Sequence, residues 1–325
     1  MLSSPLFPFL PMHIPDGFLS VVVSLVFWVV SIAFISVALR KTSLELGERE
    51  VPVMGVLAAA IFAGQMLNFT IAGGTSGHLL GAALAVILLG PWPAVLVMTS
   101  VVSVQAILFQ DGGILALGTN IFNMAVVGVL VSHTVFTLLK RLLKTHPRGI
   151  ITAGFCAAWF SIFLTSIACA LELALSGTSP SNIAVPAMAA IHALIGLGEG
   201  LITAGALAFL AAARRDLIQR DQSQTVSGHS ILIGGGLIAL ILAILAPLAS
   251  SHPDGLEWVA EQNHFGAAAR EALFNLIPDY AMPGISNPAL ATIAAAILGV
   301  VIVFSVAYGL ARAEKRAAVK ETTEG

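Results

Sequence analysis

Long apolar runs separated by short polar stretches cover most of this chain. A helix needs about 20 predominantly apolar residues to cross a bilayer, and nine runs approach that length. They lie at residues 18–39, 52–71, 77–90, 92–109, 114–139, 149–175, 183–212, 230–250 and 288–311. The pattern predicts an all-α polytopic membrane protein with about nine transmembrane helices, arranged as a seven-span bundle and a two-span C-terminal unit.

The basic residues support this count and give an orientation. Cytoplasmic loops of membrane proteins carry an excess of Lys and Arg. With nine spans and the N-terminus outside, every one of the 15 Lys and Arg residues except Arg270 falls on the inner side. We therefore expect a multi-pass protein of a bacterial-type inner (plasma) membrane, with its C-terminus in the cytoplasm.

The outer side is acidic under the same orientation. It carries Asp16, Asp111, Asp254, Glu257, Glu261, Glu271 and Asp279. A negative mouth raises the local concentration of cations, although ordinary solvated loops explain these carboxylates equally well.

A polar stretch divides the chain. Residues 216–229 are predicted to be a cytoplasmic linker between a seven-span domain, 12–215, and a two-span domain, 230–325, whose outer loop 251–287 is the longest in the chain. Residues 1–11 lack the basic start of a signal peptide, and prolines break their short apolar stretch. We expect them to be an extra segment, with translation beginning at Met12.

The composition and the missing signatures exclude several classes of protein. Hydrophobic residues make up 58% of the chain, charged residues 10%, and mean hydropathy is +0.96, whereas soluble domains carry about 25% charged residues. The net charge of −2 argues against a nucleic-acid partner. The sequence has no P-loop or dinucleotide-binding signature. Any energy source is therefore either an ion gradient or another subunit.

Two histidines at the outer membrane edge suggest metal chemistry. His13 precedes the first span, and His78 lies in the glycine-rich stretch FTIAGGTSGHLLG, 69–81, which can fold back into the bundle where it lines a cavity. If Met12 is the first residue, its amine, the next backbone nitrogen and the imidazole of His13 can chelate one metal ion, with His78 as a fourth ligand. Square-planar nitrogen sites suit Ni(II) or Cu(II), and binding should release protons.

Polar residues inside the predicted spans allow other interpretations of the function. His192 and Glu199 share a helical face and can form a structural hydrogen-bonded pair. Glu199 and Glu172 can instead serve a stand-alone secondary transporter that couples metal movement to protons. A membrane enzyme is the least favoured reading, because the sequence has no HExxH motif and no Ser/Lys arrangement of the needed kind.

Several motifs resemble a known family. MHIPDGFLS, QMLNFTIAGGTSGHLLG, LGPWPAVLVMT and QDGGILALGTNIFNM resemble the substrate-binding subunit of cobalt and nickel energy-coupling factor (ECF) transporters, the CbiM/NikM type, over roughly 12–215. SHPDGLEWVAEQ and PDYAMPG resemble the PDGLE-type small subunit of the nickel members. The resemblance implies that the N-terminus loops into the bundle and that Met12, His13 and His78 supply the metal ligands. The family's chain begins at the Met of Met-His, 11 residues later than this one.

The resemblance also implies a function and partners. The chain would be the metal-capturing component of an uptake transporter for Ni²⁺ or Co²⁺, with no covalent chemistry and no cofactor of its own. Its partners would be a transmembrane coupling subunit and ATP-binding cassette ATPase subunits. Polar residues that can support the ligand histidines through hydrogen bonds, or simply pack helices, are Asn68, Thr75, Ser76, Gln105, Asn120 and Asn123. The PDGLE-like part favours nickel, without deciding between the two metals.

Overall fold

A computed structural model describes residues 13–45, 47, 50–71, 74–143, 146–213 and 228–324. Met12 and most of the expected linker lie outside these ranges. Within them the fold is a helical bundle with one two-stranded antiparallel sheet, in which β1 (Phe69–Ile71) pairs with β2 (Thr75–Gly77). The expected all-α membrane class is confirmed.

Seven helical segments of the described chain are long and apolar enough to cross a membrane. They are α1 (Val21–Glu45), α4 (Pro91–Phe109), α5 (Leu117–Ile121) continued by a π-helical turn (Phe122–Val127) and α6 (Gly128–Leu143), α7 (Pro147–Leu175), α8 (Ser181–Ala213), α10 (Gly228–Leu245) with the 3₁₀ turn Ala246–Leu248, and α12 (Pro288–Glu324). Two further apolar helices are shorter, α2 (Glu50–Gln65) with 16 residues and α3 (Ala82–Leu89) with 8. Each of the nine expected runs therefore contains a helix.

The third run differs from the expected continuous helix over 77–90. Residues 75–77 form β2, residues 78–81 are irregular, and α3 begins only at Ala82. Gly81 has a φ of +84°, in the left-handed region, and a Cβ there would lie 2.7 Å from Cγ2 of Ile61. A helix cannot continue through such a residue. Irregular backbone at membrane depth is tolerated where protein surrounds it, so the chain passes through the bundle here as a half-helix preceded by an extended segment.

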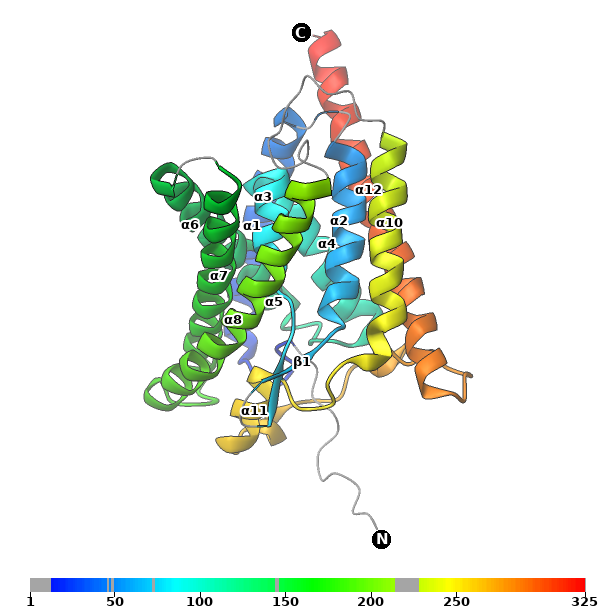
Figure 1. Cartoon of the computed structure of the whole chain (residues 1–325). Coiled ribbons are helices and arrows are strands. Elements are labelled where there is room, and N and C mark those ends of the chain that lie inside the picture. The colour runs from blue at the N-terminus through cyan, green and yellow to red at the C-terminus, as the bar shows by residue number, and fades with distance from the viewer. Residues whose placement is uncertain are drawn as a thin grey trace.

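Successive helices run in alternating directions, so α1 begins and α12 ends at opposite ends of the bundle (Figure 1). The β1–β2 hairpin and α11 (Gly255–Gln262) lie at the end where α1 begins (Figure 1). The described basic residues other than Arg270 lie at or near helix ends on the opposite side: Arg40, Lys41, Lys140, Arg141, Arg148, Arg312, Lys315, Arg316 and Lys320. Segregation of basic residues to one end is common among membrane proteins.

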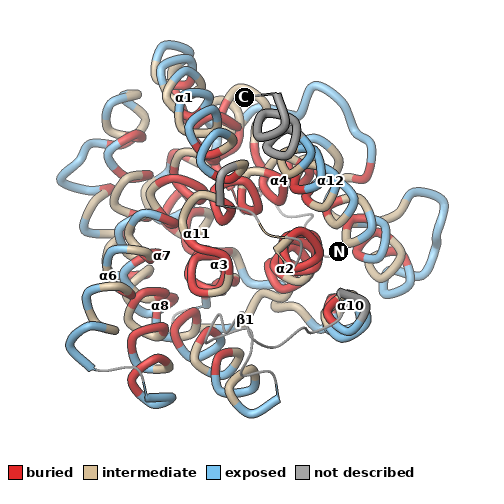
Figure 2. The backbone as a smooth tube through the Cα atoms, turned by 90° about the horizontal axis from the view of Figure 1, so that it is seen from above, coloured by how far each residue is buried: buried red, intermediate tan, exposed pale blue. Residues whose placement is uncertain are grey.

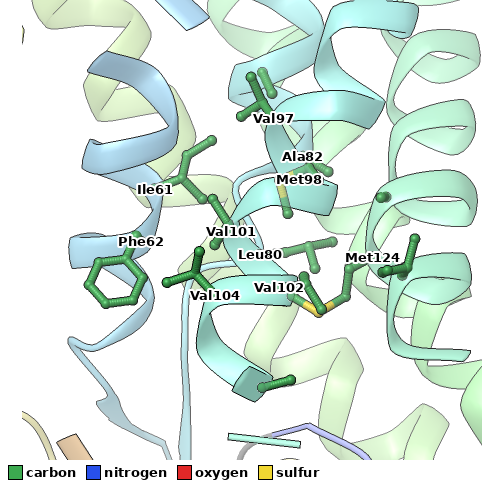
Figure 3. Packing of buried hydrophobic residues seen from close by; sticks show 14 of the residues in the cluster. Ile61, Phe62, Leu80, Ala82, Val97, Met98, Val101, Val102, Val104 and Met124 are labelled. Atoms are coloured by element: carbon green, nitrogen blue, oxygen red, sulfur yellow. The ribbon is translucent and has the colours of Figure 1, made fainter. Parts of the chain in front are cut away.

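The core lies around α2, α3 and α4. Figure 2 shows α2 and α3 buried in the middle of the bundle, surrounded by helices with exposed outer faces. Side chains of α2 and α4, among them Phe62 and Met98, pack together there (Figure 3). The outer face of α1 is apolar as well, and Val22 is 72% exposed. An apolar outer surface of this kind suits contact with lipid.

The two C-terminal helices pack on α2 through glycines. Between α2 and α12, a Cβ on Gly55 would lie 2.9 Å from Phe304, and a Cβ on Gly299 would collide with the ring of Phe62. On α10, a Cβ on Gly235 would collide with Val56 of α2. Helices in membranes approach closely at small residues because burial from water does not drive their association. The C-terminal helices are therefore fitted to the core of the bundle.

Replacing Gly299 by Val should loosen this contact. Overpacking a close-fitting site costs about 1–3 kcal/mol, so we expect the Gly299→Val protein to unfold at lower temperature in detergent. Gly309→Val on the same helix is the control, because a Cβ there meets no atom within 4 Å. Equal melting temperatures for the two variants would contradict the packing described.

Candidate metal centre

The described chain starts inside the bundle, where residues 13–16 are held by side chains and backbone of the segment 110–120. Ile14 N donates to Asn120 Oδ1 at 3.1 Å, and Asn120 Nδ2 donates back to Ile14 O at 3.0 Å. Gly113 N also donates to Ile14 O at 3.0 Å. Asp16 Oδ1 accepts from Ala116 N at 3.0 Å. These bonds fix the backbone on both sides of Ile14 and so fix the position of His13.

His13 presents two nitrogens to one point. Its backbone N lies 3.3 Å and its Nδ1 3.0 Å from the same atom, Oδ1 of Asp111. The side chain is buried, and neither ring nitrogen makes a well-aligned hydrogen bond to the part of the chain described. Chelation of a metal by the amide nitrogen and the imidazole of one residue requires this convergence.

His78 lies beside His13 on the irregular segment between β2 and α3. The centroids of the two imidazole rings are 5.8 Å apart, with an angle of 63° between the ring planes. Nδ1 of His78 is 3.0 Å from Leu79 O. A proton on Nδ1 suits that contact and leaves the lone pair of Nε2 available for a metal.

The charges around the histidines favour one protonated and one neutral ring. Burial opposes protonation of His13, but the Asp111 carboxylate outweighs it and raises the pKa of His13 above its ordinary value. Burial would raise the pKa of Asp111, but the charge of His13 lowers it. Burial, aided by the charge of His13, lowers the pKa of His78. His78 is therefore the better metal ligand before any proton is released.

Both rings line a cavity of about 80 Å³ that continues into the bundle. The π-helical turn brings Asn123 and Met124 to its wall, and π-turns inside helices are frequent at functional sites. Other lining residues come from α7 and α8, including Cys169, Met188 and His192.

The C-terminal unit lines one side of this site. Ser76 N donates to Pro253 O at 2.8 Å, and Ser76 Oγ donates to His252 O at 2.8 Å. Asp254 caps α11 in a reciprocal capping box with Glu257. Its Oδ2 lies 4.0 Å from Nε2 of His78. The residues 252–254 thus lie against β2 and next to a candidate ligand.

Tyr280 joins the same unit to Asp111. Its hydroxyl donates to Asp111 Oδ2 at 2.5 Å, and its ring stacks on Phe109 with 4.6 Å between centroids. Asp279 and Tyr280 both adopt left-handed backbone conformations, with φ of 52° and 54°. Such conformations in non-glycine residues persist only where their surroundings hold them. Asp111 therefore bonds His13 with one oxygen and the C-terminal unit with the other.

The six residues expected to support the ligand histidines differ in their contacts with the cavity. Asn120 and Asn123 line the cavity, while Thr75 and Ser76 bind the backbone of Pro253. Asn68 and Gln105 do not line it. The expected metal ligand Met12 lies outside the described residues.

The suggested pair of His192 and Glu199 does not form. Nδ1 of His192 is 2.8 Å from Met188 O, and the oxygens of Glu199 accept from the backbone N–H groups of Leu80 and Gly81. Two backbone N–H groups before α3 are better partners for a carboxylate than an imidazole already bonded to its own helix.

Sequence reasoning missed three residues near the ligands. Asp111 contacts His13, Asp254 approaches His78, and Tyr280 bonds Asp111. The sequence indicated Asp111 and Asp254 only as outer carboxylates. Each belongs to a motif quoted above, QDGG, PDGLE or PDY. Over the described ranges, no group of three or more His, Cys, Asp or Glu residues is placed to hold a metal ion. A centre on His13 and His78 therefore needs backbone or amine nitrogens as well.

The ion pair of His13 and Asp111 should make the docking of residues 13–16 depend on pH. The raised pKa of His13 contributes stability below the ordinary value of 6.5 that is lost as pH rises through the raised value. The lowered pKa of Asp111 contributes stability above its ordinary 3.8 that is lost as pH falls through the lowered value. In the metal-free protein we expect hydrogen-exchange protection of this segment to fall when pH is raised from about 6 to above the pKa of His13.

Asp111→Asn should remove that pH dependence, because it removes the charge that raises the pKa of His13. Glu271→Gln, on the exposed outer loop, is the matched control and should behave as the wild type. Protection factors that change equally with pH in Asp111→Asn and in the wild type would show that the pair does not hold the segment.

Comparisons with known proteins agree with this architecture. Residues 13–217 match the model of the family described as the cobalt uptake substrate-specific transmembrane region, and residues 229–316 match the PDGLE domain. A protein of Archaeoglobus fulgidus, named as a fused nickel transport protein, is 37% identical over 303 residues, which are 93% of this chain and 98% of that protein. The fused nickel transport protein of Rhodobacter capsulatus is 30% identical over 330 residues, covering 90% and 95%.

A solved structure is similar over about two thirds of the chain. The crystal structure of a transition metal transporter is 30% identical, with a TM-score of 0.58, and the match covers 66% of this chain and all of that one. The resemblance seen in the motifs is thus confirmed. The chain belongs to the cobalt uptake substrate-specific transmembrane family and carries a PDGLE domain fused behind it.

Proposed function

We propose that this chain is the metal-capturing membrane component of an ATP-driven, ECF-type uptake transporter for Ni²⁺ or Co²⁺. The observation that carries the proposal is the convergence of the backbone N and Nδ1 of His13 on one point, with the ring of His78 beside them in the same cavity. Membership of a cobalt uptake family, and relatives named for nickel and cobalt transport, support the choice of substrate.

Met12 supplies the remaining nitrogen in this proposal. When the chain starts at Met12, the amine, the amide of His13 and Nδ1 of His13 form fused chelate rings, and Nε2 of His78 takes the fourth position. Four nitrogens in a plane favour Ni(II) over Co(II). The names of the fused relatives also favour nickel.

The site faces the outside in this proposal. The end of the bundle that carries His13, His78 and α11 is opposite to the end where the described basic residues gather. The basic end faces the cytoplasm under the positive-inside rule. The metal then enters across the acidic outer loops and is captured before it moves inward.

Energy comes from partner chains in this proposal. A transmembrane coupling subunit and ATP-binding cassette ATPases would move the captured ion, since the sequence has no nucleotide-binding motif. The rival proton-coupled transporter depends on Glu172 and Glu199 as proton carriers. Both oxygens of Glu199 already bind backbone N–H groups, and Glu172 accepts from Asn123 Nδ2 at 2.6 Å.

The N-terminus is the first thing to measure. Mass spectrometry of protein expressed from its own upstream region should identify an N-terminal peptide that starts at Met12 with an unblocked amine. A chain that retains residues 1–11 would lack that amine, and the three-nitrogen chelate could not form.

Nickel titration of the chain that starts at Met12 tests the ligand set. We expect His78→Ala to weaken binding by at least about 100-fold, because even outer-sphere partners of a ligand contribute 10–100-fold. His133→Ala on α6, at a position that does not line the cavity, should bind as the wild type. Wild-type affinity in His78→Ala would exclude this set of ligands.

Reconstitution tests the energy source. Vesicles with this chain alone should bind nickel without accumulating it, whereas adding the coupling and ATPase subunits should give ATP-dependent accumulation of radioactive nickel. Accumulation by the chain alone, driven by a pH gradient, would support the proton-coupled rival instead.

A further inference from the structure

A fully buried carboxylate on α8 holds the segment that carries His78. Glu199 Oε2 accepts from Leu80 N at 2.7 Å, and Glu199 Oε1 accepts from Gly81 N at 3.0 Å. The side chain of Glu199 is buried completely. The two amides come directly before α3 and only two and three residues after His78.

A second helix binds the same peptide from the other side. Gln65, the last residue of α2, donates from Nε2 to Leu80 O at 2.8 Å. The side chain of Leu80 is buried between α4 and the π-helical turn, close to Val102 and Met124 (Figure 3). The N–H, the C=O and the side chain of Leu80 are therefore all fixed by the surrounding bundle.

Glu199 lies away from the cavity in which the metal is proposed to bind. His192 on the same helix lines the cavity, and Glu199 follows it by seven residues, about 10 Å further along α8 toward the basic end of the bundle. Glu199 does not line the cavity, and its hydrogen bonds to Leu80 N and Gly81 N are what connect it to the segment that carries His78.

A carboxylate is well suited to this place. It offers two acceptors to two neighbouring N–H groups, and a negative charge before the first turn of a helix interacts favourably with the helix dipole. Glutamine offers one acceptor, and its NH₂ group would face a second donor. The chain needs such an external cap because the N-cap residue of α3, Gly81, has no side chain to provide one.

We infer that Glu199 is a positioning residue for metal capture, which fixes the backbone after β2 so that the imidazole of His78 faces His13. The inference rests on the proposed function and deepens it. A purely structural cap would stabilise α3 without changing how the metal is held. A positioning role predicts that Glu199 affects affinity only while His78 is present.

A double-mutant cycle measures this difference. In the chain that starts at Met12, Glu199→Ala should weaken nickel binding about 10–100-fold, as loss of support for a ligand does. Glu199→Gln should lose less, because it keeps one acceptor. The double variant His78→Ala with Glu199→Ala should bind no more weakly than His78→Ala alone.

Thr203→Ala is the matched control. Thr203 lies one turn further along α8, is equally buried, and its Oγ1 has no hydrogen bond within the described chain. This variant should keep wild-type affinity. The absorption band of square-planar Ni(II) should change in Glu199→Ala as it does in His78→Ala, and it should not change in Thr203→Ala.

Two results would overturn the inference. One is wild-type affinity in folded Glu199→Ala protein, or in Glu199→Gln if the alanine variant cannot be purified. The other is a double variant in which the two losses of affinity add. Wild-type affinity in His78→Ala would instead refute the ligand set of the proposed function, so the two failures are distinguishable.

Discussion

Backbone amide and carbonyl groups inside a membrane-spanning bundle have no water to bind, so each irregular stretch must find its partners within the protein. Three irregular stretches meet at the candidate metal centre. The segment 13–16 is bonded by Asn120, Gly113 and Ala116, and the peptide of Leu80 is bonded by Glu199 and Gln65. Residues 252–254 are bonded by Thr75 and Ser76. In each stretch, the groups that form hydrogen bonds with the backbone also fix the position of a side chain at the candidate metal centre.

Asp111 connects two of these stretches through charge as well as hydrogen bonds. A buried ionised group is costly unless it is paired, and removing one partner leaves the other uncompensated. Asp111 has partners on both sides, the nitrogens of His13 and the hydroxyl of Tyr280. The bonding of the N-terminal segment and the docking of the C-terminal loop therefore depend on the same carboxylate.

Hydrophobic runs in the sequence predicted the helical class and the approximate positions of the nine apolar helices of the described chain, because about 20 apolar residues are needed wherever a helix crosses lipid. The metal chemistry of an N-terminal Met-His pair indicated His13 and His78, whose ring centroids are 5.8 Å apart in the structure. The break in the third run was not predicted, since it depends on Gly81 fitting against Ile61. The roles of Asp254, Tyr280 and Glu199 also depend on contacts between residues more than 100 positions apart in sequence, and no local pattern reports such contacts.

The bonding of residues 252–254 to Thr75 and Ser76, and of Tyr280 to Asp111, has a further consequence, because these residues belong to the same chain as the two histidines. A tethered element returns to its contact by an intramolecular step, with an effective concentration set by the tether and not by expression. A separate small subunit would have to reach a comparable concentration in the membrane to occupy the same contact for the same fraction of time. In the fused chain, every bundle is synthesised together with these C-terminal residues, at a fixed ratio of one to one.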